Sequence, residues 1–289
     1  MTVSQNDRGP GQLVVVATPL GNLGDISRRA LEVLESADVV YCEDTRRSRT
    51  LVSAFSLSPK GRLVALHEHN EASLCAEVVE RVRRGETVAV VTDAGTPGIS
   101  DPGSRVVAAV ADAGLTVTTA PGPSAVVAAL SISALPTERF VMEGFFPRRA
   151  GERESRLDEW GRERRTIVFY EAPQRLVATL DELAGRFPKR RVTVVRELTK
   201  LHEEVVRGTA ATVAAQFTGR EVLGEIVVVL EGAPAEVVVD EATVTALLFE
   251  RLSEGESVRD AVAAAVDLLG AAHRPTYELA LRLRAGQES

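Results

Sequence analysis

The first half of the chain alternates short apolar runs with segments in which apolar residues recur at helical spacing. The runs that predict buried strands are residues 13–18, 39–43, 63–66, 88–92 and 116–119. The segments that predict helices are residues 26–36, 74–84 and 104–113. Strands that alternate with helices indicate an α/β fold with a largely parallel sheet, and continuously apolar strands indicate helices on both faces.

The pattern changes after Leu135-Pro136. Strands are expected at residues 139–145, 166–170, 191–197, 204–208 and 225–231, with a helix at 176–183 and a charged segment at 148–165. This order predicts a second α/β domain whose sheet is more antiparallel. Beyond residue 241 the pattern is only helical, with turns at Gly255 and Gly270. We therefore expect a disordered tail (1–10), α/β domains at 11–122 and 123–233, and a helical extension at 240–289.

Composition limits the class of protein. The chain has 289 residues, 45% hydrophobic and 26% charged, which is typical of a folded protein with room for two domains. It has no apolar run near the roughly 20 residues of a membrane span and no secretion signal at its start, so we expect a cytoplasmic protein. The net charge of −7 disfavours nonspecific coating of nucleic acid but allows a local basic patch. Cys42 and Cys75 are expected to be buried, inert thiols.

Three turns rich in glycine and proline follow expected strands, at residues 17–25, 92–103 and 120–125. A single such turn is more often only a loop. Three together predict a ligand cleft, because ligands of open α/β sheets bind beyond the carboxyl ends of the strands. Neither GxGxxG nor GxxxxGK[ST] is present, and Asp101-Pro102 reads as an ordinary helix start. The residues alone predict a nucleoside-like ligand that carries an amino acid.

These turns and several further segments resemble the tetrapyrrole methylase family. The segments are residues 17–26, 43–46, 66–71, 93–97, 135–145, 169–171, 196–200 and 224–226. They occur in order between residues 13 and 232, and the set is most similar to family members that methylate ribosomal RNA. The resemblance implies two α/β domains with S-adenosylmethionine in the cleft between them, plus a C-terminal helical extension.

The resemblance also implies an activity and a donor site. The activity is 2′-O-methylation of a cytidine ribose in small-subunit ribosomal RNA near the decoding centre, on free RNA or the assembled subunit, by a homodimer without a metal. The implied donor-site residues are Pro19, Asp93, Ala94, Gly95, Ile99, Ser124, Ala125, Phe169, Tyr170, Gly224, Glu225 and Ile226. The chain departs from the family pattern at Gln174 (usually His), at Leu223 (usually Lys), and at residues 270–277, which lack the usual lysines.

Methyl transfer to a ribose hydroxyl benefits from a base. Candidates at the expected strand ends are Glu43, Asp44, His67, Glu71 and Lys200, with Glu197 comparable. Asp44 reads equally well as a helix N-cap. His67 and His69 share a strand face, but the lack of further ligand residues nearby disfavours a metal.

RNA contacts require basic side chains. Arg46, Arg47 and Arg49 form one cluster. Arg148 and Arg149, followed by Arg153 and Arg156, form another, which interleaved glutamates make more typical of a solvated face. Trp160 is expected in a core or interface.

Two other functions remain open. One is a methylase of tetrapyrrole carbons, which the matches at 43–46 and 66–71 disfavour. The other is a noncatalytic module that binds the donor and docks on the ribosome, which the many polar residues at the strand ends disfavour.

Overall fold

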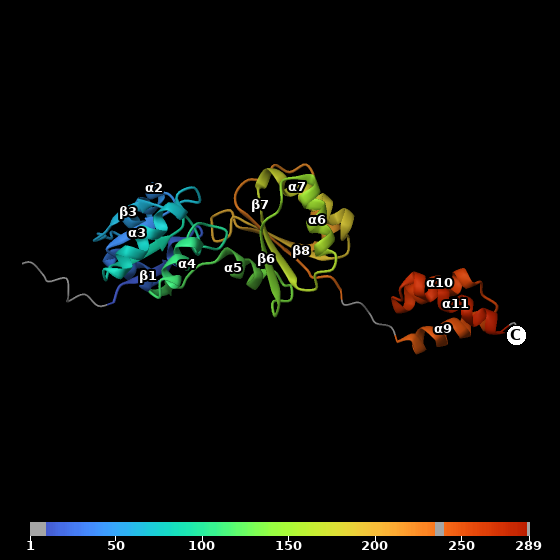
Figure 1. Ribbon diagram of the computed structural model, residues 1–289. Coiled ribbons are helices and arrows are strands. Elements are labelled where there is room, and N and C mark those ends of the chain that lie inside the picture. Colours follow the sequence, from blue (N-terminus) through green and yellow to red (C-terminus); the bar gives the residue numbers. More distant parts are fainter. Residues whose placement is uncertain (1–9, 235–239, 288–289) are drawn as a thin grey trace, which may run out of the picture. The chain divides into compact units, whose positions relative to one another are not determined.

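The computed structural model describes residues 10–234 and 240–287, so nearly all of the tail expected at 1–10 lies outside the described residues. The chain divides into two compact units, one ending at Ala233 and one beginning at Pro234 (Figure 1). The first unit contains two five-stranded sheets.

The first sheet is entirely parallel, as the sequence predicted, in the order β3-β2-β4-β1-β5. Its strands are β1 (Gln12–Val16), β2 (Val39–Cys42), β3 (Arg62–Ala65), β4 (Thr87–Val91) and β5 (Thr116–Ala120). The helices between them are α1 (Arg28–Ser36), α2 (Thr45–Ala54), α3 (Glu71–Arg83) and α4 (Ser104–Asp112), with a short 3₁₀ turn η2 (Leu23–Asp25) before α1.

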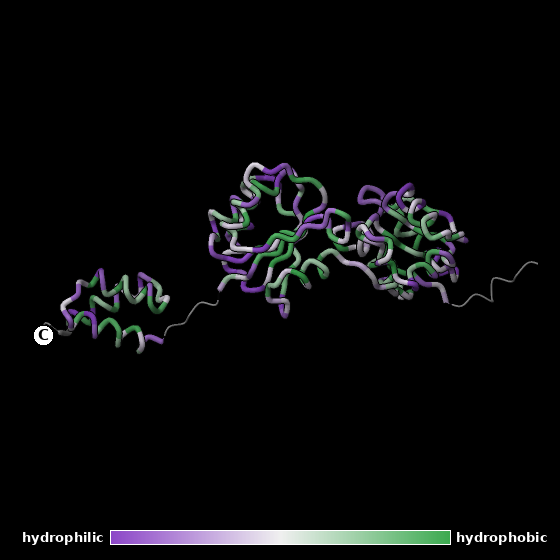
Figure 2. Tube along the Cα trace, turned by 180° about the vertical axis from the view of Figure 1, so that it is seen from behind, coloured by the Kyte–Doolittle hydropathy of each residue, from purple (hydrophilic) through white to green (hydrophobic). Residues whose placement is uncertain are grey.

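Alternate residues of these strands enter two cores, one on each face of the sheet. Leu13 and Val88 pack with α3 and α4, whereas their neighbours Val14 and Ala89 pack with α1. Successive strand residues point to opposite faces, so continuously apolar strands are buried on both sides. In Figure 2 the hydrophobic colour accordingly lies mostly in the interior of this part of the chain.

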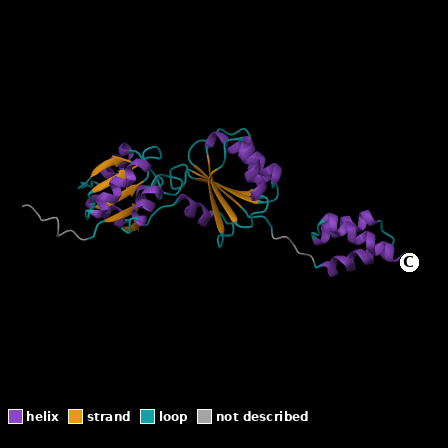
Figure 3. Cartoon of the chain, viewed as in Figure 1, coloured by secondary structure: helices purple, strands orange, loops and turns teal. Residues whose placement is uncertain are grey.

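The second sheet has the order β6-β7-β10-β8-β9. Its strands are β6 (Phe140–Phe145), β7 (Thr166–Glu171), β8 (Arg191–Arg196), β9 (Glu204–Thr209) and β10 (Ile226–Leu230). β6 and β7 are parallel and the other pairs are antiparallel, which confirms the more antiparallel sheet (Figure 3). Helix α5 (Ala125–Ile132) packs on one face, while α6 (Ala150–Trp160), α7 (Pro173–Arg186) and α8 (Ala210–Phe217) pack on the other.

Beside the second sheet, the charged segment 148–165 contains helix α6, which its composition did not predict. Arg153, Leu157 and Trp160 are buried at positions i, i+4 and i+7 of α6, so a narrow stripe suffices to dock it. Trp160 is 1% exposed and packs between Phe146 and Phe169, which confirms its place in the core. Cys42 is buried as expected, whereas Cys75 is only half-buried.

The second unit consists of α9 (Glu241–Ser253), α10 (Val258–Leu269) and α11 (His273–Gln287). Val244, Leu248, Val262 and Ala280 contribute to its own apolar core. Gly270 ends α10 with φ +69°, a left-handed conformation that glycine adopts without a steric penalty. None of the described helices, in either unit, is long and apolar enough to cross a membrane.

Candidate active site

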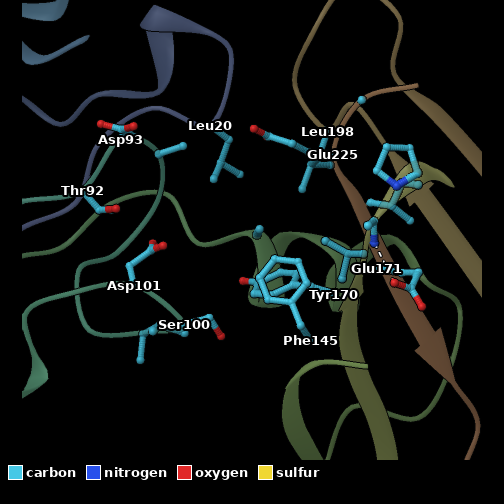
Figure 4. A pocket seen from close by; sticks show the side chains of 18 of the residues that line it. Leu20, Thr92, Asp93, Ser100, Asp101, Phe145, Tyr170, Glu171, Leu198 and Glu225 are labelled. Carbon is cyan, nitrogen blue, oxygen red and sulfur yellow. Dashed lines mark hydrogen bonds between the residues drawn. The ribbon is translucent and has the colours of Figure 1, made fainter. Parts of the chain in front are cut away.

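A cavity of about 490 Å³ opens where the strands of the first sheet end and β6, β7 and β10 of the second sheet approach (Figure 4). We call it the central cavity. The first sheet's connections contribute Leu20, Glu43, Arg47, Thr92, Asp93, Ala94, Ile99, Ser100 and Asp101. The second sheet, with its helices and loops, contributes Ala125, Phe145, Tyr170, Glu171, Ala172, Pro173, Gln174, Val195, Leu198, Gly224, Glu225, Ile226 and Val227.

The three glycine- and proline-rich turns are joined to one another beside this cavity. Thr18 and Gly95 exchange backbone hydrogen bonds of 2.9 and 3.0 Å, and the Thr18 hydroxyl donates to the Thr92 carbonyl at 3.0 Å. The Thr96 hydroxyl donates to the Pro123 carbonyl at 3.0 Å. Gly95 has φ +87°, which residues with a side chain rarely adopt. The turns therefore form one connected floor beside the cavity.

The central cavity is acidic on the side of the first sheet. Glu43 accepts a hydrogen bond from the Thr92 hydroxyl at 2.8 Å. Asp93 accepts one from the Asp44 amide at 3.1 Å and lies 3.4 Å from the Arg47 guanidinium. Arg47 is the one basic residue among the residues that line this cavity. The site thus presents an excess of negative charge with a single cation beside Asp93.

Two carboxyl groups of this cavity have raised pKa values. Burial, followed by the charge of Glu43, raises the pKa of Asp93. Burial also raises the pKa of Asp101 to about 6, with smaller contributions from the charges of Glu43, Asp93 and Glu225. On the opposite wall, burial and the charge of Asp101 raise the pKa of Tyr170 to about 12. Carboxyl groups with such shifts in a cleft are candidates for proton transfer.

The interpretation of Asp101 as a helix start was wrong. The N-cap of α4 is Gly103, whose φ is +129°. The capping carboxylate comes from Glu71, which is 4% exposed and accepts hydrogen bonds from the amides of Gly103, Arg105 and Val106. Asp101 is thereby released to face the central cavity, where Figure 4 shows it near Thr92 and Ser100.

Most residues of the implied donor site line the central cavity. They are Asp93, Ala94, Ile99, Ala125, Tyr170, Gly224, Glu225 and Ile226. Pro19 lines a smaller cavity of about 200 Å³ that also touches Arg47 and Asp93. Gly95 and Ser124 lie outside the lining.

The side chain of Phe169 also lies outside the lining. It is 0% exposed and packs against Trp160, because alternate residues of β7 face opposite sides of the sheet and Tyr170 takes the cavity side. Ser124 is the N-cap of α5, but its hydroxyl makes no capping hydrogen bond.

Of the proposed bases, only Glu43 lines the central cavity. Asp44 caps α2 by accepting from the Arg46 amide at 2.7 Å, which confirms the capping alternative. Hydrogen bonds from Arg46 lower the pKa of Asp44 to about 2. Glu71 caps the N-terminus of α4. His67 lies outside the lining of the central cavity, and its backbone amide donates to the side-chain oxygen of Asn70.

Lys200 stands outside the lining of the central cavity, next to Glu225. Its ammonium donates to Glu197 at 2.9 Å and to Glu225 at 3.1 Å, and these bonds, opposing the effect of burial, raise its pKa. Glu197 and Thr199 have left-handed backbones, with φ +52° and +65°, on either side of Leu198, which lines the cavity. Such conformations cost free energy and cluster at functional sites.

The two arginine clusters differ in how much charge they leave accessible. Arg46 and Arg49 are exposed on α2, although Arg46 pairs with Asp44. Arg148 and Arg149 are exposed, with Arg149 paired to Glu152. The remaining members of the second cluster, Arg153 and Arg156, form ion pairs with Glu182 and Glu143.

Sequence reasoning missed several lining residues, among them Leu20, Thr92, Ser100, Asp101, Phe145, Leu198, Val227 and residues 171–174. Asp101 was detectable, because it lies in the same glycine-rich turn as Asp93. Phe145 ends a strand and is 60% exposed, which the apolar pattern of β6 could not show. Residues 171–174 line the cavity because β7 ends there, which depends on the pairing of distant strands.

The sequence is similar to a known protein family and to named relatives. The family of tetrapyrrole (corrin/porphyrin) methylases matches residues 12–214. Ribosomal RNA small subunit methyltransferase I of Mycobacterium tuberculosis is 45% identical over 95% of this chain and 96% of its own length. The protein of the same name from Xylella fastidiosa is 42% identical over 93% of this chain and 98% of its own length.

Solved structures agree on the fold. Diphthine synthase aligns with a TM-score of 0.57 at 16% identity, over 76% of this chain and 89% of its own. Uroporphyrin-III C-methyltransferase from Thermus thermophilus, complexed with S-adenyl homocysteine, aligns with a TM-score of 0.52 at 21% identity, over 76% of this chain and 97% of its own. With the family matched over most of the chain and near-full-length relatives above 40% identity, the chain belongs to the tetrapyrrole methylases, in the group of the ribosomal RNA small subunit methyltransferases I.

Proposed function

We propose that this protein transfers the methyl group of S-adenosylmethionine to the 2′-hydroxyl of a cytidine ribose in small-subunit ribosomal RNA, near the decoding centre. The observation that carries the proposal is its 45% identity, over 95% of the chain, to a relative named for methylating that RNA. The central cavity supplies a site of suitable chemistry.

The residues of the central cavity fit the methyl donor. The volume of the cavity, about 490 Å³, lies within the range of roughly 300–1,000 Å³ typical of small-molecule sites. The carboxylates complement a sulfonium cation, and the Arg47–Asp93 pair offers one partner each for the donor's carboxylate and ammonium groups. Tyr170 and the chain at 224–227 offer an aromatic ring and backbone groups for a nucleoside. When bound, the donor supplies an electrophilic methyl group.

The charge of the cavity disfavours the alternative of tetrapyrrole methylation. Tetrapyrrole precursors carry many carboxylates, which Glu43, Asp93, Asp101 and Glu225 would repel. An RNA substrate places only a ribose at the reacting centre, and its phosphates can contact exposed arginines such as Arg46 and Arg49 outside the cavity.

Methyl transfer to defined RNA tests the function. The protein is incubated with labelled S-adenosylmethionine and either naked small-subunit RNA or the assembled subunit, and ribose methylation is mapped by mass spectrometry. We expect one 2′-O-methylcytidine, absent when that nucleotide is 2′-deoxycytidine. Donor binding without transfer to either substrate would instead support a noncatalytic module. Sedimentation of the same preparation tests the homodimer, which we propose together with a cytoplasmic location.

The exposed arginines of α2 give a separate prediction for RNA binding. Arg46→Ala and Arg49→Ala should each weaken RNA binding and reduce the slope of log K against log salt by about one, because each removes one phosphate contact. Donor affinity should stay unchanged, since neither residue lines the central cavity. Arg47→Ala should weaken donor binding as well.

A matched control is Arg84→Ala. Arg84 is exposed and follows α3, before β4, at the edge of the sheet opposite the cavity. Its substitution should leave both the affinity and the salt slope unchanged. Equal slopes for wild type, Arg46→Ala and Arg49→Ala would show that this cluster is only a solvated face.

A further inference from the structure

We propose that the Asp101 carboxylate accepts the proton of the ribose 2′-hydroxyl during methyl transfer. This inference rests on the proposed function and names the base that the function requires.

The other carboxylates of the cavity are already engaged. Glu171 has a fully buried side chain, which forms an ion pair with Arg175 and accepts from the Thr179 hydroxyl at 2.6 Å. Glu225 pairs with Lys200 at 3.1 Å. A carboxylate held by a cation or by several donors is a weaker base.

The remaining two belong to the wall formed by the first sheet. Asp93 pairs with Arg47 and accepts from the Asp44 amide. Glu43 accepts from the Thr92 hydroxyl at 2.8 Å and from the Asp93 amide at 3.4 Å. Asp101 forms no ion pair with any described arginine, lysine or histidine, and Thr92 is the neighbouring hydroxyl that lowers its pKa.

The Thr92 hydroxyl donates to Glu43 and lies near Asp101. A hydroxyl group has one proton to donate and can accept at the same time. In the structure the Thr92 proton points to Glu43, so the ionised Asp101 carboxylate keeps its lone pairs for the ribose hydroxyl. Once Asp101 is protonated, its own O–H can donate to Thr92, whose proton then points to Glu43, the geometry seen at 2.8 Å. The same orientation of the Thr92 hydroxyl therefore accommodates both states of Asp101 with little movement of heavy atoms.

The surroundings set the strength of this base. Burial raises the pKa of Asp101 to about 6. The groups that face it are Thr92, which lowers the pKa, and Glu43, Asp93 and Glu225, which raise it; Tyr170 faces it from β7. At pH 7 to 8 the group is still ionised, yet it binds a proton more readily than an ordinary carboxylate, which favours general-base catalysis.

The proposed step balances in atoms and charge. The ribose oxygen forms a bond to the methyl carbon as the bond between that carbon and the sulfonium sulfur breaks, and the hydroxyl proton moves to Asp101. The products are the neutral methyl ether, the neutral thioether and the protonated carboxyl group. Asp101 is half-buried, so the proton can afterwards exchange with solvent.

Asp101→Asn tests the step under single-turnover conditions. Asn keeps the shape of the side chain but cannot accept the proton, so we expect the rate to fall roughly 10²-fold, the scale of general-base catalysis. S-adenosylmethionine is supplied at saturating concentration, because Asp101 is one of the carboxylates that line the donor cavity. RNA affinity should stay within about twofold, since proton transfer is separable from binding. Asp101→Glu should recover part of the rate, and Asp112→Asn, an exposed residue at the end of α4, should match wild type.

The pH profile of the wild-type enzyme gives a second measurement that needs no variant. Because the pKa of Asp101 is raised to about 6, the group is protonated and inactive below that pH. The single-turnover rate should therefore rise with pH through about 6 and then level off, and Asp101→Asn should lose this rise.

The outcomes separate the two proposals. If the wild-type protein methylates no ribosomal RNA, the proposed function fails. If it does so, but the rate shows no rise near pH 6, or Asp101→Asn retains a rate within a few-fold of wild type, Asp101 is not the base. Asp101→Asn with unchanged melting temperature, a lost pH dependence and a slow rate supports the inference.

Discussion

Gly95→Val is expected to weaken binding of S-adenosylmethionine by more than about tenfold, or about 1.4 kcal/mol. Gly95 does not itself line the central cavity, but its amide and carbonyl both bond to Thr18. A Cβ at this position would already lie 3.4 Å from the Leu20 side chain, which does line the cavity. The two methyl groups of valine would displace Leu20 and the Asp93–Ala94 turn, and calorimetry would measure the loss.

Backbone strain must be separated from this local effect. With φ +87°, Gly95 is left-handed, a conformation that costs residues with a side chain about 1–2 kcal/mol. Gly114 has φ +69°, and a Cβ there would meet no atom within 4 Å, so Gly114→Val provides the matched control. Both variants should lose similar stability, and only Gly95→Val should lose donor affinity. Equal donor affinities would show that this turn does not shape the donor site.

Arg175→Met should lower the free energy of unfolding by about 3–5 kcal/mol, the cost of leaving a buried charge without its partner. The Glu171 side chain is 0% exposed and pairs with Arg175. The same guanidinium also donates to the carbonyls of Phe146 and Pro147, at 3.1 and 3.2 Å. Methionine replaces the aliphatic part of the side chain but none of these hydrogen bonds.

Urea unfolding measures the change, and the melting temperature should fall by roughly 6–20 °C for a unit of this size. Arg28→Met is the control, because the Arg28–Glu32 pair has side chains 93% and 60% exposed. Exposed pairs contribute about 0–1 kcal/mol, so this variant should melt close to wild type. A loss below about 1 kcal/mol for Arg175→Met would mean that Glu171 is stabilised by its other donors.

The alternation of strands and helices in the first sheet was predictable because its central strands β1, β2 and β4 are apolar on both faces. Helices α6 and α8, whose burial depends on tertiary partners, were not predictable from the sequence. Helix α8 mixes alanine, a strong helix former, with valine, threonine and phenylalanine, which favour strands, so its local propensities conflict. It is buried through Val213 and Phe217. Helix α6 is mostly charged and is buried along one narrow stripe.

The site was predicted from the sequence in outline only. The glycine-rich turns located one wall, since the ends of parallel strands share an edge. The roles of individual carboxylates depended on contacts between distant segments. Glu71 caps helix α4, which begins more than 30 residues further along the chain, and Asp101 therefore faces the cavity instead of capping that helix. No local sequence pattern indicates that a distant carboxylate takes over the capping role.

The joined turns of the cavity floor also couple ligand occupancy to the stability of the fold. Thr18, Gly95 and Pro123 come from three distant parts of the sequence, so their hydrogen bonds form only after β1, β4 and β5 have assembled. A donor that needs this floor binds the native state alone, and at 100 times its dissociation constant it adds about 2.7 kcal/mol to the free energy of unfolding. The supply of methyl donor in the cell would then influence how long each copy of the protein survives proteolysis, as well as how fast it works.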